Sequence, residues 1–163
     1  MPIDYEFKKT LTRELTAILR DENRFESVEF AMPDMITCYF HGSKYLPKNV
    51  QHKSPLIQCS FTFYPKKLVF SIEYFKGKGC ENIIKRINEE LPDLKEPVNT
   101  NSEKLSILTL LDVINEKELE YLSKTSNINL RMNILKEKID SFFEIKANKI
   151  ISKIIEILVG IRV

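Results

Sequence analysis

The sequence predicts a single α+β domain, in which an antiparallel sheet of four to five strands carries helices packed on one face. Three observations predict this class: apolar residues recur at helical spacing near the N-terminus, alternate along two central hairpins, and return to helical spacing after residue 115. The length of 163 residues suits one domain with a sizeable core. We expect residues 1–114 to form the helix-plus-sheet part and residues 115–163 the C-terminal helical part.

An N-terminal helix is predicted over about residues 4–22. Asp4 is available to cap it, and its apolar residues fall three and four apart on one face. These residues are Phe7, Leu11, Leu15, Ile18 and Leu19. The first hairpin follows, because Val28, Phe30 and Met32 alternate, Pro33-Asp34 forms a turn, and residues 35–40 resume a β-rich run.

A second hairpin spans residues 57–74, with a turn at Tyr64-Pro65-Lys66-Lys67. Its apolar residues alternate with polar ones on both sides of the turn: Ile57, Cys59, Phe61 and Phe63, then Leu68, Phe70, Ile72 and Tyr74. Residues 41–55 between the hairpins hold glycine, asparagine and two prolines without periodicity and predict a long loop. Cys38 and Cys59 alternate with apolar neighbours, so we expect buried, unreactive thiols.

After the hairpins, a short helix is predicted over residues 80–91 and ends before Pro92. Residues 93–103 are polar and predict a connection. Residues 104–112 fit two patterns, since Leu105, Ile107, Thr109 and Leu111 suit a strand whereas Leu105, Leu108 and Leu111 suit a helix. We favour the strand.

The C-terminal part is predicted to be helical throughout. Asn115 and Glu118 have the spacing of a capping box, which opens a helix that buries Leu119 and Leu122. From about Asn129 to Gly160 there is no proline and the apolar residues keep helical spacing.

The end of this helical region is unusually apolar. Lys146, Lys149, Lys153 and Glu156 share one narrow polar stripe, and isoleucines cover the remaining circumference. Two interpretations stay open: a central core helix, or a subunit or partner interface that makes the chain a homo-oligomer. The candidate interface residues are Ile150, Ile151, Ile154, Ile157, Leu158 and Ile161.

A local excess of positive charge marks the hairpins. Residues 35–78 contain seven lysines and one acid, within a chain whose net charge is only +2, and nine of the sixteen aromatic residues. Lysines that neutralise phosphates beside rings that stack on bases are typical of nucleic-acid or nucleotide sites. The candidate residues for an anion or nucleic acid are Lys44, Tyr45, Lys48, Lys53, Lys66 and Lys67. The alternative is that these lysines protect turns and sheet edges from aggregation.

One set of residues resembles a nuclease motif. The order of elements over residues 4–112, with Pro33-Asp34, Glu73 and Lys76, is similar to the core of the PD-(D/E)xK nucleases. The resemblance implies that the carboxylates hold Mg²⁺ and that the lysine polarises the attacking water. The sequence reads Glu73-Tyr74-Phe75-Lys76, ExxK in place of ExK, so an unbulged strand points Lys76 away from Glu73. We therefore assign no metal site to these residues.

Composition excludes other classes. No apolar run reaches the length of a membrane span, the first residues lack the basic and apolar regions of a signal peptide, and the three cysteines lack metal-ligand spacing. No Ser or Cys has the His and acid of a nucleophilic triad. The high lysine and isoleucine content is typical of AT-rich genomes, including those of phages and mobile elements.

We therefore expect a non-enzymatic cytoplasmic macromolecule-binding protein, an adaptor, chaperone or inhibitor that acts through protein–protein contacts and needs no cofactor or metal. A nucleic-acid or nucleotide binder that uses the lysine-rich hairpins is the alternative. A metal-dependent nuclease is the third interpretation.

Overall fold

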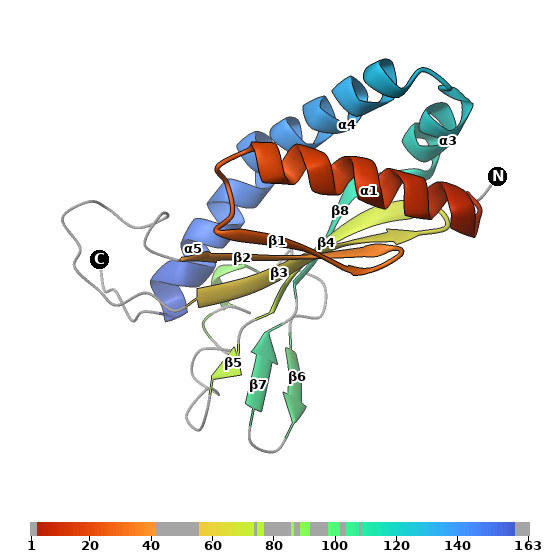
Figure 1. Ribbon diagram of the computed structural model, residues 1–163. Coiled ribbons are helices and arrows are strands. Elements are labelled where there is room, and N and C mark those ends of the chain that lie inside the picture. Colours follow the sequence, from red (N-terminus) through yellow and green to blue (C-terminus); the bar gives the residue numbers. More distant parts are fainter. Residues whose placement is uncertain are drawn as a thin grey trace.

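A computed structural model of the chain describes residues 3–41, 56–73, 75–76, 86, 89–91, 98–101, 104–107 and 109–158. An N-terminal helix and a long C-terminal helical region pack on one face of a five-stranded antiparallel sheet (Figure 1). The predicted α+β class is confirmed. The loop predicted at 41–55 lies outside the described residues from residue 42 onward, and so does most of the helix predicted at 80–91, of which residues 86, 89 and 90 are helical.

The N-terminal helix and both hairpins form where the sequence predicts them. Helix α1 (Tyr5–Asp21) begins after Asp4, whose carboxylate accepts a hydrogen bond from the Phe7 N–H at 2.8 Å. The first hairpin pairs β1 (Ser27–Met32) with β2 (Met35–His41), and the second pairs β3 (Leu56–Tyr64) with β4 (Lys67–Glu73). Each apolar side of these strands faces the helices, because side chains alternate along a strand.

The main sheet has the order β1-β2-β3-β4-β8, which leaves β1 and β8 (Thr109–Ile114) at its edges. A second sheet has the order β5-β7-β6 and consists of β5 (Phe75–Lys76), β6 (Val98–Asn101) and β7 (Lys104–Ile107). The pairing of β5 with β7 continues the register of β4 with β8. Residues 104–107 and 109–114 are therefore strands, as favoured from the sequence.

The prediction of a plain connection at residues 93–103 is wrong in part, because residues 98–101 form strand β6. This strand reads Val-Asn-Thr-Asn and pairs with β7 in antiparallel register. Its pairing uses backbone groups and needs no alternation of apolar side chains. Hydropathy alone therefore gave no signal for it.

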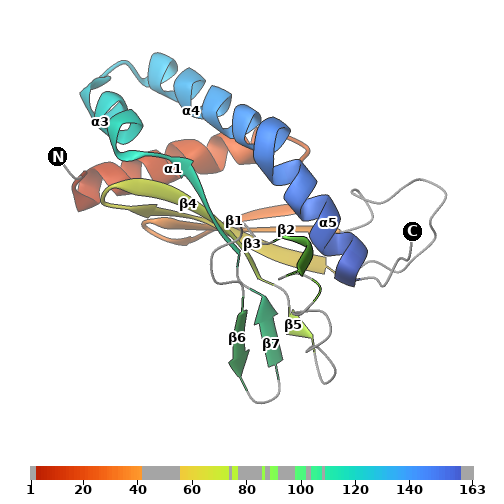
Figure 2. The ribbon, with the colours of Figure 1, turned by 180° about the vertical axis from the view of Figure 1, so that it is seen from behind.

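The C-terminal part contains α3 (Glu116–Lys124) and a long helix made of α4 (Ile128–Phe142), a π-helical turn η2 (Phe143–Ala147) and α5 (Asn148–Leu158) (Figure 2). The predicted capping box is present: Asn115 Oδ1 accepts from the Glu118 N–H at 2.9 Å, and the Glu118 carboxylate accepts from the Asn115 N–H at 3.2 Å. Leu119 and Leu122 are buried as predicted.

The core lies between the sheet and the helices, and its centre is aromatic. Phe143 in η2 packs against Phe25, Phe61, Phe70 and Phe142, with ring centroids 5.5 to 6.3 Å apart. The π-helical turn adds a residue to the helical repeat at this point. Both Phe142 and Phe143 are therefore directed into the core, at 7 and 0% exposure.

The face of the sheet turned away from the helices carries small polar side chains. Thr37, Ser60 and Ser71 lie side by side on β2, β3 and β4, and all three are buried. The hydroxyls of Ser60 and Ser71 are 2.5 Å apart and hydrogen bonded. This hydrogen bond between neighbouring strands satisfies two polar groups whose burial without a partner would destabilise the fold.

Candidate partner-binding groove

A groove of about 360 Å³ runs between α1 and the edge strand β1. Its described lining comprises Arg13, Thr16, Ala17 and Arg20 from the helix and Phe30 from the strand. Figure 1 shows β1 running beneath α1, so one helix face and one sheet edge form the two walls.

The helical wall of the groove is cationic. Lys9, Arg13, Thr16 and Arg20 are spaced four, three and four residues apart, so they form one stripe along α1. Thr16 is small and buried, which leaves room between the two arginines. Glu6 is the acid at the start of this stripe, and no described carboxylate forms an ion pair with Arg13.

The strand wall is Phe30, whose side chain faces the helices but remains exposed. Phe30 lies opposite Ile36, which is 0% exposed and belongs to the core face of the sheet. Phe30 itself is 39% exposed, whereas Phe40, Phe61 and Phe70 on that face are fully buried. The difference arises because β1 is an edge strand and no described strand lies beyond it.

The backbone edge of β1 is protected at two points. Arg20 Nε donates a hydrogen bond to the Val28 carbonyl at 3.2 Å. The pairing register with β2 shifts by one residue between Phe30 and Met32, which marks a β-bulge at Ala31. Beyond the bulge Met32 lies opposite Met35, so it faces away from the helices, and it is 54% exposed. Such features prevent strands of other molecules from pairing with a sheet edge.

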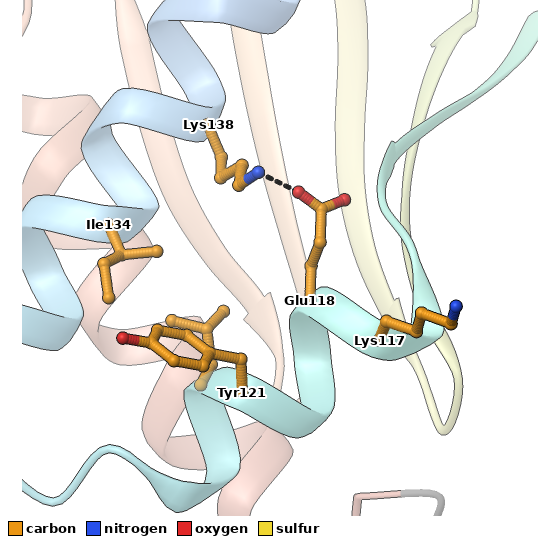
Figure 3. A pocket seen from close by; sticks show the side chains of 6 residues that line it. Lys117, Glu118, Tyr121, Ile134 and Lys138 are labelled. Carbon is orange, nitrogen blue, oxygen red and sulfur yellow. Dashed lines mark ion pairs between the residues drawn. The ribbon is translucent and has the colours of Figure 1, made fainter.

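A second concave surface lies between α3 and α4 (Figure 3). It has a volume of about 320 Å³ and is lined by Lys117, Glu118, Tyr121, Leu122, Ile134 and Lys138. Figure 3 shows Lys138 reaching across from α4 to its ion-pair partner Glu118 on α3, while the Tyr121 ring lies toward Ile134. This surface has no net charge beyond Lys117, and the ion pair bridges its two helices.

The predicted C-terminal interface residues lie mainly in the core. Ile151, Ile154 and Ile157 are 1, 1 and 2% exposed in the single chain, and Ile150 is half-buried against the core. The side chain of Leu158 and all of Ile161 lie outside the described residues. Packing within one chain accounts for the burial of Ile151, Ile154 and Ile157 without a partner. An interface role for these residues stays a prediction.

The predicted anion-binding residues are only partly described. Lys66 and Lys67 are exposed in the β3–β4 turn, where Lys67 Nζ lies 3.8 Å from Asp112 Oδ1. Lys44, Tyr45, Lys48 and Lys53 lie outside the described residues. Within the described chain these residues form no shared site.

The nuclease-like residues are distributed along the sheet. The Asp34 carbonyl accepts a hydrogen bond from the Phe63 N–H, whereas Glu73 lies opposite Gln58. Phe63 and Gln58 are five positions apart on β3, or roughly 16 Å at the rise of a strand. Two carboxylates that share one Mg²⁺ each lie about 2 Å from it. Asp34 and Glu73 are therefore placed too far apart to hold one ion together.

The two buried cysteines are neighbours. Cys38 and Cys59 lie directly opposite each other on β2 and β3, and both are free and 0% exposed. Burial raises the pKa of the Cys59 thiol well above its ordinary value, and a hydrogen bond with Cys38 raises it further. The prediction that these thiols are buried is confirmed, and their lack of reactivity stays a prediction. Within the described residues, no three His, Cys, Asp or Glu side chains gather into a metal site.

Sequence reasoning missed the α1–β1 groove. The spacing of Lys9, Arg13 and Arg20 indicates a cationic stripe on one side of the helix, but a charged stripe on a helix usually faces solvent and does not by itself indicate a binding site. Phe30 was assigned to the alternating strand pattern, which predicts a buried side chain. Its exposure depends on the strand order, which places β1 at the edge of the sheet.

Comparisons with known proteins identify no relative. No protein-family model matches the chain, and neither a curated protein nor a solved structure matches it. Among the described helices, none is both long enough and apolar enough to cross a membrane.

Proposed function

We propose that this chain is a non-enzymatic protein-binding module, an adaptor, chaperone or inhibitor, that holds its partner in the groove between α1 and β1. The exposure of Phe30 carries the proposal. The Phe30 ring is 39% exposed beside a concave surface, so a partner that covers it removes apolar surface from water and thereby stabilises the complex. Aromatic and arginine side chains are also the residue types that dominate binding energy at protein interfaces.

The shape of the groove favours a polypeptide segment over a compact small molecule. It is a trough between a helix and a strand, with Phe30 on one wall and Arg13 and Arg20 on the other. A chain segment can place an apolar side chain on the ring while its polar groups reach the guanidinium groups. On this proposal the protein acts in the cytoplasm, and binding requires no cofactor or metal.

Quantitative affinity capture from the native host tests the proposal. Phe30→Asp removes the apolar wall and is expected to lower capture of the specific partner by about tenfold or more, the loss typical of a hot-spot residue. Met32→Asp is the matched control, because Met32 lies on the same edge strand and is more exposed but faces away from the helices. Circular dichroism and urea unfolding of both variants establish that they fold.

The proposal is contradicted if the two aspartate variants capture the same proteins in the same amounts as the wild type. It is also contradicted if Met32→Asp loses the partner and Phe30→Asp keeps it, since binding would then use the opposite face of the edge strand.

Self-association through α5 remains a separate prediction, and its test uses the wild-type chain. Ile154 is 1% exposed, so Ile154→Lys is expected to unfold the chain before it reports on assembly. Light scattering of the wild type at tens of micromolar measures the assembly state directly. A monomer at that concentration contradicts the prediction.

A further inference from the structure

We propose that the partner presents an acidic segment in extended conformation, whose carboxylates bind Arg13 and Arg20 while an apolar side chain covers Phe30. This inference rests on the proposed function and adds the chemistry of the partner. Its basis is charge complementarity along one wall of the groove, together with the protected state of the β1 edge.

The two arginines are separated by a distance that an extended peptide can bridge. Arg13 and Arg20 are seven residues apart on α1, about 10.5 Å along the axis at 1.5 Å per residue. An extended chain rises about 3.3 Å per residue and directs every second side chain to the same side, so two acids four positions apart face α1 together and span roughly 13 Å. The long arginine side chains cover the remaining difference. Arg20 donates to the Val28 carbonyl through Nε, which leaves its Nη groups available to donate to a carboxylate of the partner. Lys9 adds a third cation one helical turn before Arg13.

The protected strand edge argues against a second copy of the chain in the groove. Pairing of two β1 strands needs a regular row of free backbone groups, whereas Arg20 already binds the Val28 carbonyl and the register shifts at Ala31. Contacts made by the partner's side chains avoid both obstacles. The acidic segment is therefore expected to bind through its carboxylates and its apolar side chain.

The apolar wall favours a peptide over a nucleic acid. Phosphates would be attracted by the same cations, but a nucleic-acid groove pairs many backbone charges with aromatic rings on which bases stack. This groove holds one described ring and is only about 360 Å³ in volume. One apolar side chain with flanking carboxylates fits it better.

Selection from a random displayed peptide library of about twelve residues tests the inference on the full-length chain. We expect enriched sequences to carry Asp or Glu four positions apart beside an apolar residue. The Arg13→Glu variant is expected to bind the selected peptides about tenfold more weakly. A fresh selection on this variant is expected to enrich peptides that contain Lys or Arg. Arg13 makes no described polar contact, so the charge reversal leaves the fold intact. Lys136→Glu on the exposed side of α4 is the control with the same change of charge.

The outcomes separate this inference from the proposed function. If peptide binding depends on Phe30 but not on Arg13, or if the selected peptides show no acidic bias, the proposed acidic chemistry is wrong. The proposal of a protein-binding groove is then retained. Peptides that depend on neither residue, or a library that yields no binder, overturn both. A (dT) oligonucleotide that binds more tightly than the peptides and depends on Arg13 shows a nucleic acid to be the occupant. If the wild type forms dimers and Phe30→Asp abolishes them, the occupant of the groove is a second copy of the chain.

Discussion

The Nε–H of Arg131 is shared by the two carboxylate oxygens of Glu14, at 2.6 and 2.9 Å, so that α4 and α1 are joined by a buried ion pair. Arg131 Nη1 also donates to the Thr125 carbonyl at 2.8 Å, which ties the α3–α4 connection to the same group. Both side chains are about nine-tenths buried. The pair therefore holds α1 against α4, and α1 carries the helical wall of the groove.

Breaking this pair is expected to be costly. Arg131→Met leaves the Glu14 carboxylate buried without its partner, and we expect the free energy of unfolding to fall by about 3 to 5 kcal/mol. Glu14→Leu together with Arg131→Met removes both charges and should recover most of this loss. Urea unfolding of the two variants and the wild type measures it. A single variant as stable as the wild type contradicts the assignment.

Glu22 is expected to make stability depend on pH. Burial raises the pKa of the Glu22 carboxyl, and a hydrogen bond with Asp140 raises it further, whereas Arg24 lowers it. The folded state therefore binds the proton more tightly than the unfolded state, whose carboxyl pKa is about 4.3. Stability contributed by the protonated form is present below that pKa and is lost as the pH rises through the raised value.

The Glu22→Gln variant isolates this effect, because it keeps the shape and removes the titration. We expect the variant to gain stability over the wild type as the pH rises from about 4 to 7, in parallel urea titrations. Arg24 keeps Asp140 as an ion-pair partner in the variant, with Nη2 and Oδ1 3.2 Å apart. An unchanged difference between the two proteins across this range contradicts the raised pKa.

The buried cysteines are expected to be unreactive in the folded chain. Cys38 and Cys59 are fully buried and the pKa of Cys59 is raised, so little thiolate is present or accessible. In a Cys80→Ser background, a thiol reagent at pH 8 should label neither residue in buffer and both in urea. Labelling of the folded chain at the rate of the unfolded chain would falsify this account of the core.

The hydroxyls of Ser60 and Ser71, on the face of the sheet turned away from the helices, are expected to contribute to stability in a coupled way. Ser71→Ala leaves the buried Ser60 hydroxyl without the partner it has at 2.5 Å, and we expect a loss of about 1 to 2 kcal/mol. Ser60→Ala with Ser71→Ala removes both groups and should cost less than the sum of the single changes. Additive losses in urea unfolding would show that the two hydroxyls act independently.

Much of the fold was predictable because its signals are local. The cap at Asp4, the alternation around the Pro65-Lys66 turn and the Asn115–Glu118 capping box each depend on residues a few positions apart. Strand β6 was not predicted, because its segment Asn99-Thr100-Asn101 is polar and has no apolar alternation. Backbone pairing with β7 is what makes it a strand.

The candidate site was less predictable because it depends on contacts between distant parts of the chain. Arg131 and Glu14 are 117 positions apart, and no local pattern predicts that they pair. Phe30 forms a groove wall only because β1 ends the sheet and α1 lies beside it. The burial of Ile151, Ile154 and Ile157 likewise depends on how much surface the rest of the chain covers.

Photo-crosslinking in the native host tests the central claim most directly. A photoreactive phenylalanine derivative replaces Ala17, an exposed residue in the groove, or Ile145, which is 73% exposed on η2 and serves as the control position. The proposed function predicts that Ala17 yields a crosslink to one partner protein and that Phe30→Asp abolishes the product. The inference about the partner's chemistry adds that the attached segment is acidic. Equal crosslinking from both positions, or a product that persists with Phe30→Asp, contradicts the assignment of the groove as the binding surface.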